Sequence, residues 1–405
     1  MTEAAVHTGM AANIMNYVFP NDLHVHWSLM IVLYPYITGI IAGAFIVSSL
    51  YHVFKVQDLK PVSRYSLLFA LAFLACATWP LLNHLGHPER NWEMLVTPNP
   101  SSAMAGFGYI YSLYAVLLIF EVLFIYRPTM VALKAQATGK MKTLYNILTF
   151  GSDDLSPRSL ALDKKIIGFL AAIGIPMACI LHGYVGFIFG AVKARPLWSS
   201  PLMPVIFLLS ASVSGIAGVI FSYVLIQKFK GRPVDSKCVI TLSKFLWGAF
   251  IICFTFEMLE VFQHSYLKTH HWDMIHGLLW GPLKTSYWKL QVGVCSLIPL
   301  FLLGILILFK VRDKAFVFFA TIASALLLVQ VLLMRWNVVI GGQLMSRSSR
   351  GFTTFHPEFF EKEGILPAIL IMTAPLVILW LLGKIVPMWE DKGVLTSTEP
   401  TTGHK

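Results

Sequence analysis

The sequence predicts an all-α fold, a polytopic transmembrane helical bundle of about nine helices, with a range of eight to ten. Of its 405 residues, 57% are hydrophobic and 13% are charged, which is too apolar for a water-soluble globular protein. Apolar runs recur along the chain, and a run of roughly 20 helical residues crosses a hydrocarbon core of about 30 Å. Lysine and arginine gather in alternate loops between these runs, a pattern typical of multi-pass membrane proteins.

Nine apolar runs meet this length requirement, and we expect one helix from each. They cover residues 28–54, 64–86, 103–126, 165–190, 203–229, 241–266, 288–311, 315–338 and 365–388. Gly39 and Gly43 are the positions where the first helix could bend. The chain is therefore expected to consist of one transmembrane domain, residues 28–388, between an extracytoplasmic N-terminal tail, residues 1–27, and a cytoplasmic C-terminal tail, residues 389–405.

The positive charges predict the orientation. Residues 1–27 contain no lysine or arginine, whereas residues 127–165 contain seven and residues 228–244 contain five. Because positive loops stay in the cytoplasm, the N-terminus is expected outside and the C-terminus inside the cell membrane. The loop at 127–164 is expected to be a solvated connector. The net charge of +11 follows from the same bias and suits anionic lipid, so it does not indicate nucleic-acid binding.

Several kinds of site have no support in the sequence. The five cysteines are scattered, without C-x-x-C, C-x-x-C-H or zinc-ligand spacing. We therefore expect no iron–sulfur cluster, haem or other metal held by this chain, and no catalytic centre of its own. The first 26 residues lack the basic and apolar regions of a signal peptide, so the first helix is expected to act as an uncleaved signal anchor.

Residues 182–218 form two apolar runs joined by a polar, aromatic-rich turn. The first run carries His182 and Tyr184, and an unsatisfied imidazole or phenol in lipid would cost several kcal/mol. The second run places Ser210, Ser214 and Gly218 on one helical face, where small residues let a neighbouring helix approach closely. The first run is therefore interpreted as site and the second as scaffold.

Acidic residues inside the apolar runs are few. Glu257, Glu260 and His264 are spaced i, i+3 and i+7, so they share one helical face. This face suits a proton relay, although a structural ion pair with Arg335, at the outer end of the eighth helix, explains the acids equally well. Glu121 could begin a proton path from the inside, or could simply reach water at the interface.

Three sequence blocks together resemble the NrfD and polysulfide-reductase membrane subunits, and the match runs over most of the chain. They are NHLGHPERNWEMLVTPNPSS from Asn83, HGYVGFIFGAVKARPLWSSPLMP from His182, and RWNVVIGGQL from Arg335. The first block has His84 where relatives frequently have aspartate, and His87 where they frequently have arginine.

The resemblance implies a helical bundle with a quinone pocket toward its outer face, next to an extracytoplasmic, ferredoxin-like iron–sulfur subunit. The quinone would be menaquinone or a related molecule, and further membrane and cytochrome subunits would complete the complex. The Tyr184-Val185-Gly186 triplet resembles the Y-T-G of relatives, whose tyrosine contacts the head group. We expect His182 to act beside it and Tyr34 to form the opposite wall where some relatives have histidine, with His84 also at the site.

Two other classes of membrane protein remain open. A di-haem cytochrome b could use His84, His182 and His264 as ligands, but would need a further pair near the inner face, where only His52 lies. A secondary transporter would place its polar residues at the midplane within inverted repeats. Here the polar residues gather toward the outer side, which disfavours a transporter.

Overall fold

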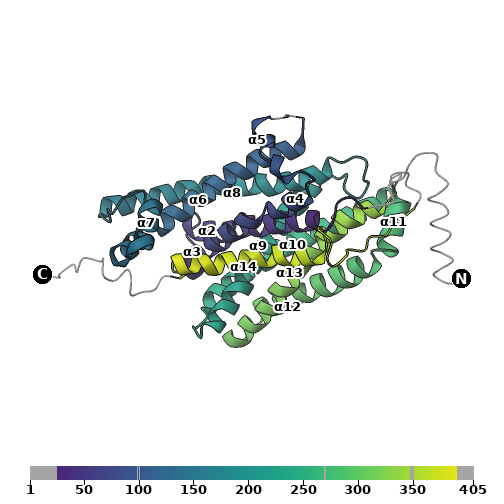
Figure 1. Ribbon diagram of the computed structural model, residues 1–405. Helices are drawn as coiled ribbons and strands as arrows, with labels where there is room; N and C mark the ends of the chain where they lie inside the picture. The colour runs from purple at the N-terminus through teal and green to yellow at the C-terminus, as the bar shows by residue number, and fades with distance from the viewer. Residues whose placement is uncertain (1–24, 98, 100, 269–270, 347–350, 390–405) are drawn as a thin grey trace.

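The computed structural model describes residues 25–97, 99, 101–268, 271–346 and 351–389. In this part of the chain, nine helical segments are long and apolar enough to cross a membrane, which confirms the predicted number. They are α2 (Leu29–His52), the segment Gln57–His84 with α3 (Lys60–Cys76) and α4 (Trp79–His84), α6 (Ala103–Gln136), α8 (Pro157–Gly190), α9 (Met203–Phe229), α10 (Ser236–Leu267), the segment Lys284–Leu308 with the π-helix η3 (Lys284–Leu297) and α12 (Ile298–Leu308), α13 (Asp313–Leu344) and α14 (Ile365–Ile385). Figure 1 shows these helices side by side along one direction, as an all-α bundle.

Shorter elements fill the connections. They are η1 (Gln57–Leu59), η2 (Pro88–Arg90), α5 (Glu93–Val96), α7 (Gly139–Leu148) and α11 (Trp272–Trp280). The expected terminal tails lie almost entirely outside the described residues, so their boundaries stay predictions.

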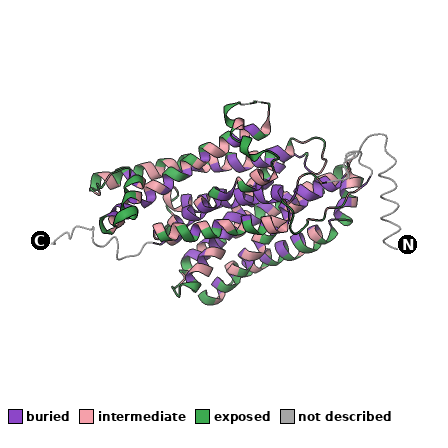
Figure 2. Ribbon diagram, in the orientation of Figure 1, coloured by how far each residue is buried: buried purple, intermediate pink, exposed green. Residues whose placement is uncertain are grey.

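The centre of the bundle is α2, whose apolar sequence is buried along its whole length (Figure 2). Helices α6, α8, α12 and α14 instead expose large apolar side chains, such as Phe169, Phe301 and Leu370. Because a lipid-facing helix surface must be apolar, this exposed belt is the surface expected to contact hydrocarbon chains.

Helices α2 and α9 pack closely at glycines. A Cβ atom added to Gly43 would lie 2.7 Å from the Cα of Gly215, so neither position has room for a side chain. Gly43 is therefore a close-packing position, and the sequence had suggested a bend there instead. The small-residue stripe predicted on α9 does face neighbouring helices, since Gly218 lies against Phe69. The tightest contact, however, is at Gly215, one residue beyond Ser214.

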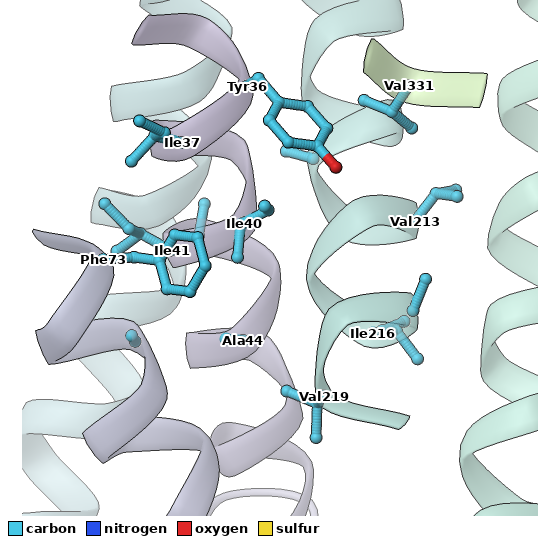
Figure 3. Packing of buried hydrophobic residues seen from close by; sticks show 14 of the residues in the cluster. Tyr36, Ile37, Ile40, Ile41, Ala44, Phe73, Val213, Ile216, Val219 and Val331 are labelled. Carbon is cyan, nitrogen blue, oxygen red and sulfur yellow. The ribbon is translucent and has the colours of Figure 1, made fainter. Parts of the chain in front are cut away.

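Branched and aromatic side chains complete the packing around this crossing. Figure 3 shows Tyr36 and Ile40 on the side of α2 that faces α9, Ile37 on the opposite side of α2, and Val213 and Ile216 on α9. The Tyr36 hydroxyl donates a hydrogen bond to the Leu328 carbonyl of α13 at 3.1 Å, so this phenol is satisfied within the core. The central helices α2, α9 and α13 thus pack directly against one another.

The solvated connector predicted at residues 127–164 is largely helical. Helix α6 continues to Gln136, α7 follows, and α8 already begins at Pro157. At 34 residues, α6 is about 51 Å long from a rise of about 1.5 Å per residue, well beyond the hydrocarbon core. A buried ion pair joins the two long helices here, with Arg127 Nη2 lying 2.6 Å from Asp163 Oδ2. Charge pairing lets the helices continue where the sequence suggested a loop.

Helix α13 also extends further than predicted, to Leu344 instead of residue 338. Arg335 therefore lies well inside this helix and is fully buried, whereas the sequence had placed it at the outer end. Beyond Arg335, Asn337 and Gln343 find hydrogen-bond partners inside the bundle.

Candidate functional site

A cavity lies between α2, α4, α5 and α6, with the end of α8 at one side, and is called the α2–α6 cavity below. Its walls are mainly apolar and aromatic, including Trp27, Ile31 and Phe107. Among its polar groups are Tyr34 and His84, two of the residues that the sequence predicts at a quinone site. An apolar cavity with a few convergent polar groups is typical of a small-molecule site.

Tyr34 reaches the α2–α6 cavity from the central helix. Its ring packs edge-to-face against Phe107, with 5.4 Å between the ring centroids. The Tyr34 hydroxyl is buried and has no hydrogen-bond partner among the described residues. Because an unpaired buried hydroxyl costs free energy, this group is suited to bind a ligand oxygen in the cavity.

His84 stands at the end of α4, where the cavity approaches the protein surface. Its Nδ1 lies 2.8 Å from Oε2 of Glu363, in the segment between α13 and α14. The same carboxylate oxygen accepts a hydrogen bond from Ser28, which caps the N-terminus of α2. Since Nδ1 is engaged, Nε2 is the nitrogen that a ligand in the cavity would meet. Sequence reasoning missed Glu363, because it lies in an irregular segment 279 residues from His84.

His182 does not line the α2–α6 cavity. It lies in a buried cluster between α8, α9 and α13. Arg335 Nη2 lies 3.0 Å from His182 Nε2 and donates to the Ser210 hydroxyl at 2.7 Å. The Arg335 guanidinium also lies 3.7 Å from the centre of the Phe207 ring, a cation–π contact. Gly39 of α2 makes room for the imidazole, because a Cβ there would lie 3.2 Å from His182 Cε1.

The Arg335 side chain makes no ion pair with a carboxylate of the described residues. The structural pairing of Arg335 with Glu257 or Glu260, left open by the sequence, is therefore wrong. The side chain of Arg335 points toward α8 and α9, where it bonds to His182. The carboxylate of Glu257 is instead hydrogen-bonded to amide side chains.

Tyr184 projects from α8 toward α6. A Cβ added to Gly106 would lie 2.9 Å from Tyr184 Cζ and would overlap its hydroxyl, so the missing side chain at Gly106 accommodates the phenol. Tyr184 is not among the residues that line the α2–α6 cavity. The structure therefore separates Tyr184 from His182, as a spacing of two residues on a regular helix requires.

A second, smaller cavity lies between α10, α11, η3 and α13, and is called the α10–α13 cavity below. Glu257, Glu260 and His264 all line it, so the three residues predicted to share a face do converge on one space. His264 Nε2 lies 3.2 Å from Glu260 Oε1, and Ser200 donates to the other Glu260 oxygen at 2.8 Å.

Amide side chains extend this network across the bundle. Glu257 accepts hydrogen bonds from Gln330 at 3.0 Å and from Gln291 at 3.2 Å. Asn337 in turn donates to Gln291 at 2.7 Å and accepts from Ser286 at 2.7 Å. Sequence reasoning missed these amides, although the signal was present as single Gln and Asn residues inside apolar runs. The irregular turn geometry of η3 is of the kind that frequently accompanies functional sites.

Glu121 is also fully buried, on α6, and neither of its carboxyl oxygens has a partner among the described residues. The interpretation that it simply reaches water is therefore wrong. It does not line either cavity described above.

The histidines considered as haem ligands have different partners: His84 with Glu363, His182 with Arg335 and His264 with Glu260. In the described residues, no group of three or more His, Cys, Asp or Glu side chains is arranged to hold a metal ion.

Comparison with known proteins decides the family. Residues 19–346 match the model of the family described as Polysulphide reductase, NrfD. The chain belongs to the NrfD family. This confirms the resemblance seen in the three sequence blocks and the NrfD-like helical bundle. Glu363 lies beyond the matched residues.

Three relatives of the chain are informative. It is 32% identical over 287 residues to a selenate reductase subunit of Mesobacillus selenatarsenatis, covering 69% of this chain and 66% of that protein. It is 27% identical over 281 residues to a putative dimethyl sulfoxide reductase membrane subunit of Halobacterium salinarum, covering 69% and 61%. It is 22% identical over 359 residues to the Hdr-like menaquinol oxidoreductase integral membrane subunit of Archaeoglobus fulgidus, covering 88% and 80%. The alignments thus span just under two thirds of the first two relatives.

Proposed function

We propose that this chain is the quinone-reactive membrane subunit of a multi-subunit redox complex and that the α2–α6 cavity holds the quinone head group. The observation that carries the proposal is the unpartnered Tyr34 hydroxyl in an apolar cavity that also contains His84. A quinone needs an apolar slot for its ring and hydrogen-bonding groups at its oxygens, and this cavity offers both.

A bound quinone would supply two-electron, two-proton chemistry. The protein's part is to hold the head group and to exchange its protons. The Tyr34 hydroxyl would bind one oxygen, and His84 Nε2 would accept or donate a proton at the other. The Phe107 ring, edge-on to Tyr34, restricts the position of the phenol.

The electron partner is proposed to be an extracytoplasmic, ferredoxin-like iron–sulfur subunit, with other membrane and cytochrome subunits completing the complex. Family membership supports partners of this kind, since relatives are named as subunits of reductases and of a menaquinol oxidoreductase. The last name favours menaquinol. Within the family, the three sequence blocks most resemble those of DsrP, the membrane subunit of the DsrMKJOP complex, which favours a place in sulfur or sulfite respiration. The N-terminus is proposed to lie outside and the C-terminus in the cytoplasm, from the alternation of positive loops.

A proton relay is proposed along the α10–α13 cavity, through Glu257, Glu260 and His264. Arg335 supports a connection to the quinone site, because it bonds to His182, which packs against Gly39 of the helix that carries Tyr34, while its neighbour Met334 lines the α10–α13 cavity. Glu121 would serve a path toward the inner face, because it is a buried carboxyl without a partner in the described chain.

Quinone content and affinity test the proposed function. The purified complex should retain extractable quinone, and replacing Tyr34 by Phe should weaken binding of a short-chain menaquinone about tenfold, from the loss of one buried hydrogen bond of about 1.4 kcal/mol. Tyr36→Phe is the matched control, since the Tyr36 hydroxyl bonds to the Leu328 carbonyl away from the cavity. If both variants bound quinone with equal affinity, the quinone site could not be the α2–α6 cavity. A stoichiometric haem in the purified chain would favour the cytochrome b alternative.

A further inference from the structure

The segment before α14 is fastened to the end of α4 by three consecutive residues. Asn83 donates to the Lys362 carbonyl at 2.5 Å, His84 bonds to Glu363 at 2.8 Å, and Lys362 donates to the Leu85 carbonyl at 3.1 Å. Bonds on both sides of His84 fix the position of Glu363 much more firmly than an isolated surface ion pair would. The Glu363 carboxylate therefore has a defined place behind the imidazole.

His84 and Glu363 connect the cavity with the surface. His84 lines the α2–α6 cavity, while the side chains of His84 and Glu363 keep 24% and 28% of their accessible surface. A ligand atom in the cavity and water at the outer surface would thus meet opposite ends of one hydrogen-bonded pair. The hydrogen bond from Ser28 holds the carboxylate from the side of α2.

Other charged groups near this end of the bundle are engaged elsewhere. Lys362 is directed to the Leu85 carbonyl, His87 bonds to Glu89, and Arg90 bonds to Glu93. Within the described chain, Glu363 is the carboxylate that pairs with His84.

We propose that Glu363 is the proton acceptor behind His84, and that the pair carries protons between the quinone pocket and outer water. This inference rests on the proposed function, since it concerns the protons of that same site. Oxidation of a quinol releases two protons and two electrons, and for each proton in turn an O–H bond breaks as an N–H bond forms at His84 Nε2. The proton on Nδ1 then passes to the Glu363 carboxylate and from there to water, while the electrons pass to the partner's iron–sulfur cluster. Quinone reduction runs the same steps in reverse.

Replacing Glu363 by Gln in the whole complex separates proton transfer from binding. Glutamine keeps the shape of the side chain and can still bond to His84 and Ser28, but it does not take up a proton. We expect quinone content and affinity to match the wild type, while turnover at saturating quinol falls at least about tenfold. Glu361→Gln is the control, because Glu361 is an exposed acid in the same segment, and its turnover should be unchanged.

Chemical rescue distinguishes proton transfer from a structural role. Formate or azide added from the outside should partly restore turnover in Glu363→Gln, and Glu363→Asp should retain more activity than Glu363→Gln. Wild-type turnover in Glu363→Gln would overturn the inference, as would loss of bound quinone together with turnover, since that would make the pair a structural clamp. A wild-type complex that binds no quinone would instead overturn the proposed function itself.

Discussion

The two cavities contain similar polar residue types but differ in how those groups are satisfied. In the α2–α6 cavity, the Tyr34 hydroxyl has no partner among the described residues. In the α10–α13 cavity, Glu257 is already bonded to two amides, and Glu260 is bonded to Ser200 and His264. A group with an open hydrogen-bonding position can bind a ligand without losing an existing bond, whereas a connected network is suited to passing protons along its own bonds, although His264 Nδ1 and Gln330 Oε1 lack a partner in the described structure. This difference is the reason why ligand binding is proposed for the first cavity and proton transfer for the second.

Local sequence explains this difference. The α2–α6 cavity is built from aromatic side chains and from the break between α3 and α4, which leave space without adding hydrogen-bond partners. The α10–α13 cavity is built against η3 and α13, which contribute Gln291, Gln330 and Asn337. The Arg335 side chain lines neither cavity, and its contacts are His182, Ser210 and Phe207.

Removing the Arg335 charge should have the largest effect on function. A buried ion pair would cost about 3–5 kcal/mol when broken, but Arg335 has no paired carboxylate in the described structure. We therefore expect Arg335→Gln to assemble at normal yield while quinol turnover falls on the order of a hundredfold, because the positive charge held at His182, which packs against the helix that carries Tyr34, is lost. Yield, thermal stability of the complex and turnover are the measurements.

Arg90→Gln is the control for Arg335→Gln, since Arg90 is exposed and pairs with Glu93 at the surface. A complex that fails to assemble with Arg335→Gln would show that the cluster is structural. Arg335 would then no longer support a connection between the two cavities.

Replacing Glu257 by Gln tests whether the second cavity conducts protons. The amide oxygen of glutamine can still accept from Gln291 and Gln330, so the complex should assemble normally. We expect turnover to fall about tenfold or more, because general acid–base groups contribute at least that much when they are required. The Glu260→Gln variant should lose less, since Glu260 is partly exposed and water can replace it. Lost yield at normal specific turnover would instead make the network structural.

The sequence predicted the broad architecture well, because hydrocarbon thickness sets helix length and positive loops mark the turns. It also placed Glu257, Glu260 and His264 together, since residues on one helical face stay together whatever the helix packs against. The sequence did not predict contacts between segments that lie far apart along the chain. The partner of His84 is 279 residues away, and that of Arg335 is 153 residues away. Helical periodicity gives the direction of a side chain on its own helix but does not identify the neighbouring helix.

Tyr184 should show the smallest effect of the residues discussed here. Its motif resembles that of a head-group contact, yet its hydroxyl is directed to Gly106 and it does not line the α2–α6 cavity. If the cavity is the quinone site, Tyr184→Phe should leave assembly intact and reduce turnover by no more than about threefold, the effect of a modest net hydrogen bond. Tyr34→Phe, measured beside it, should be slower. If Tyr184→Phe were instead the slower variant, the quinone head group would have to lie at the interface of α6 and α8. The α10–α13 cavity would then have to be compared with a ligand site at that interface, and not with the α2–α6 cavity.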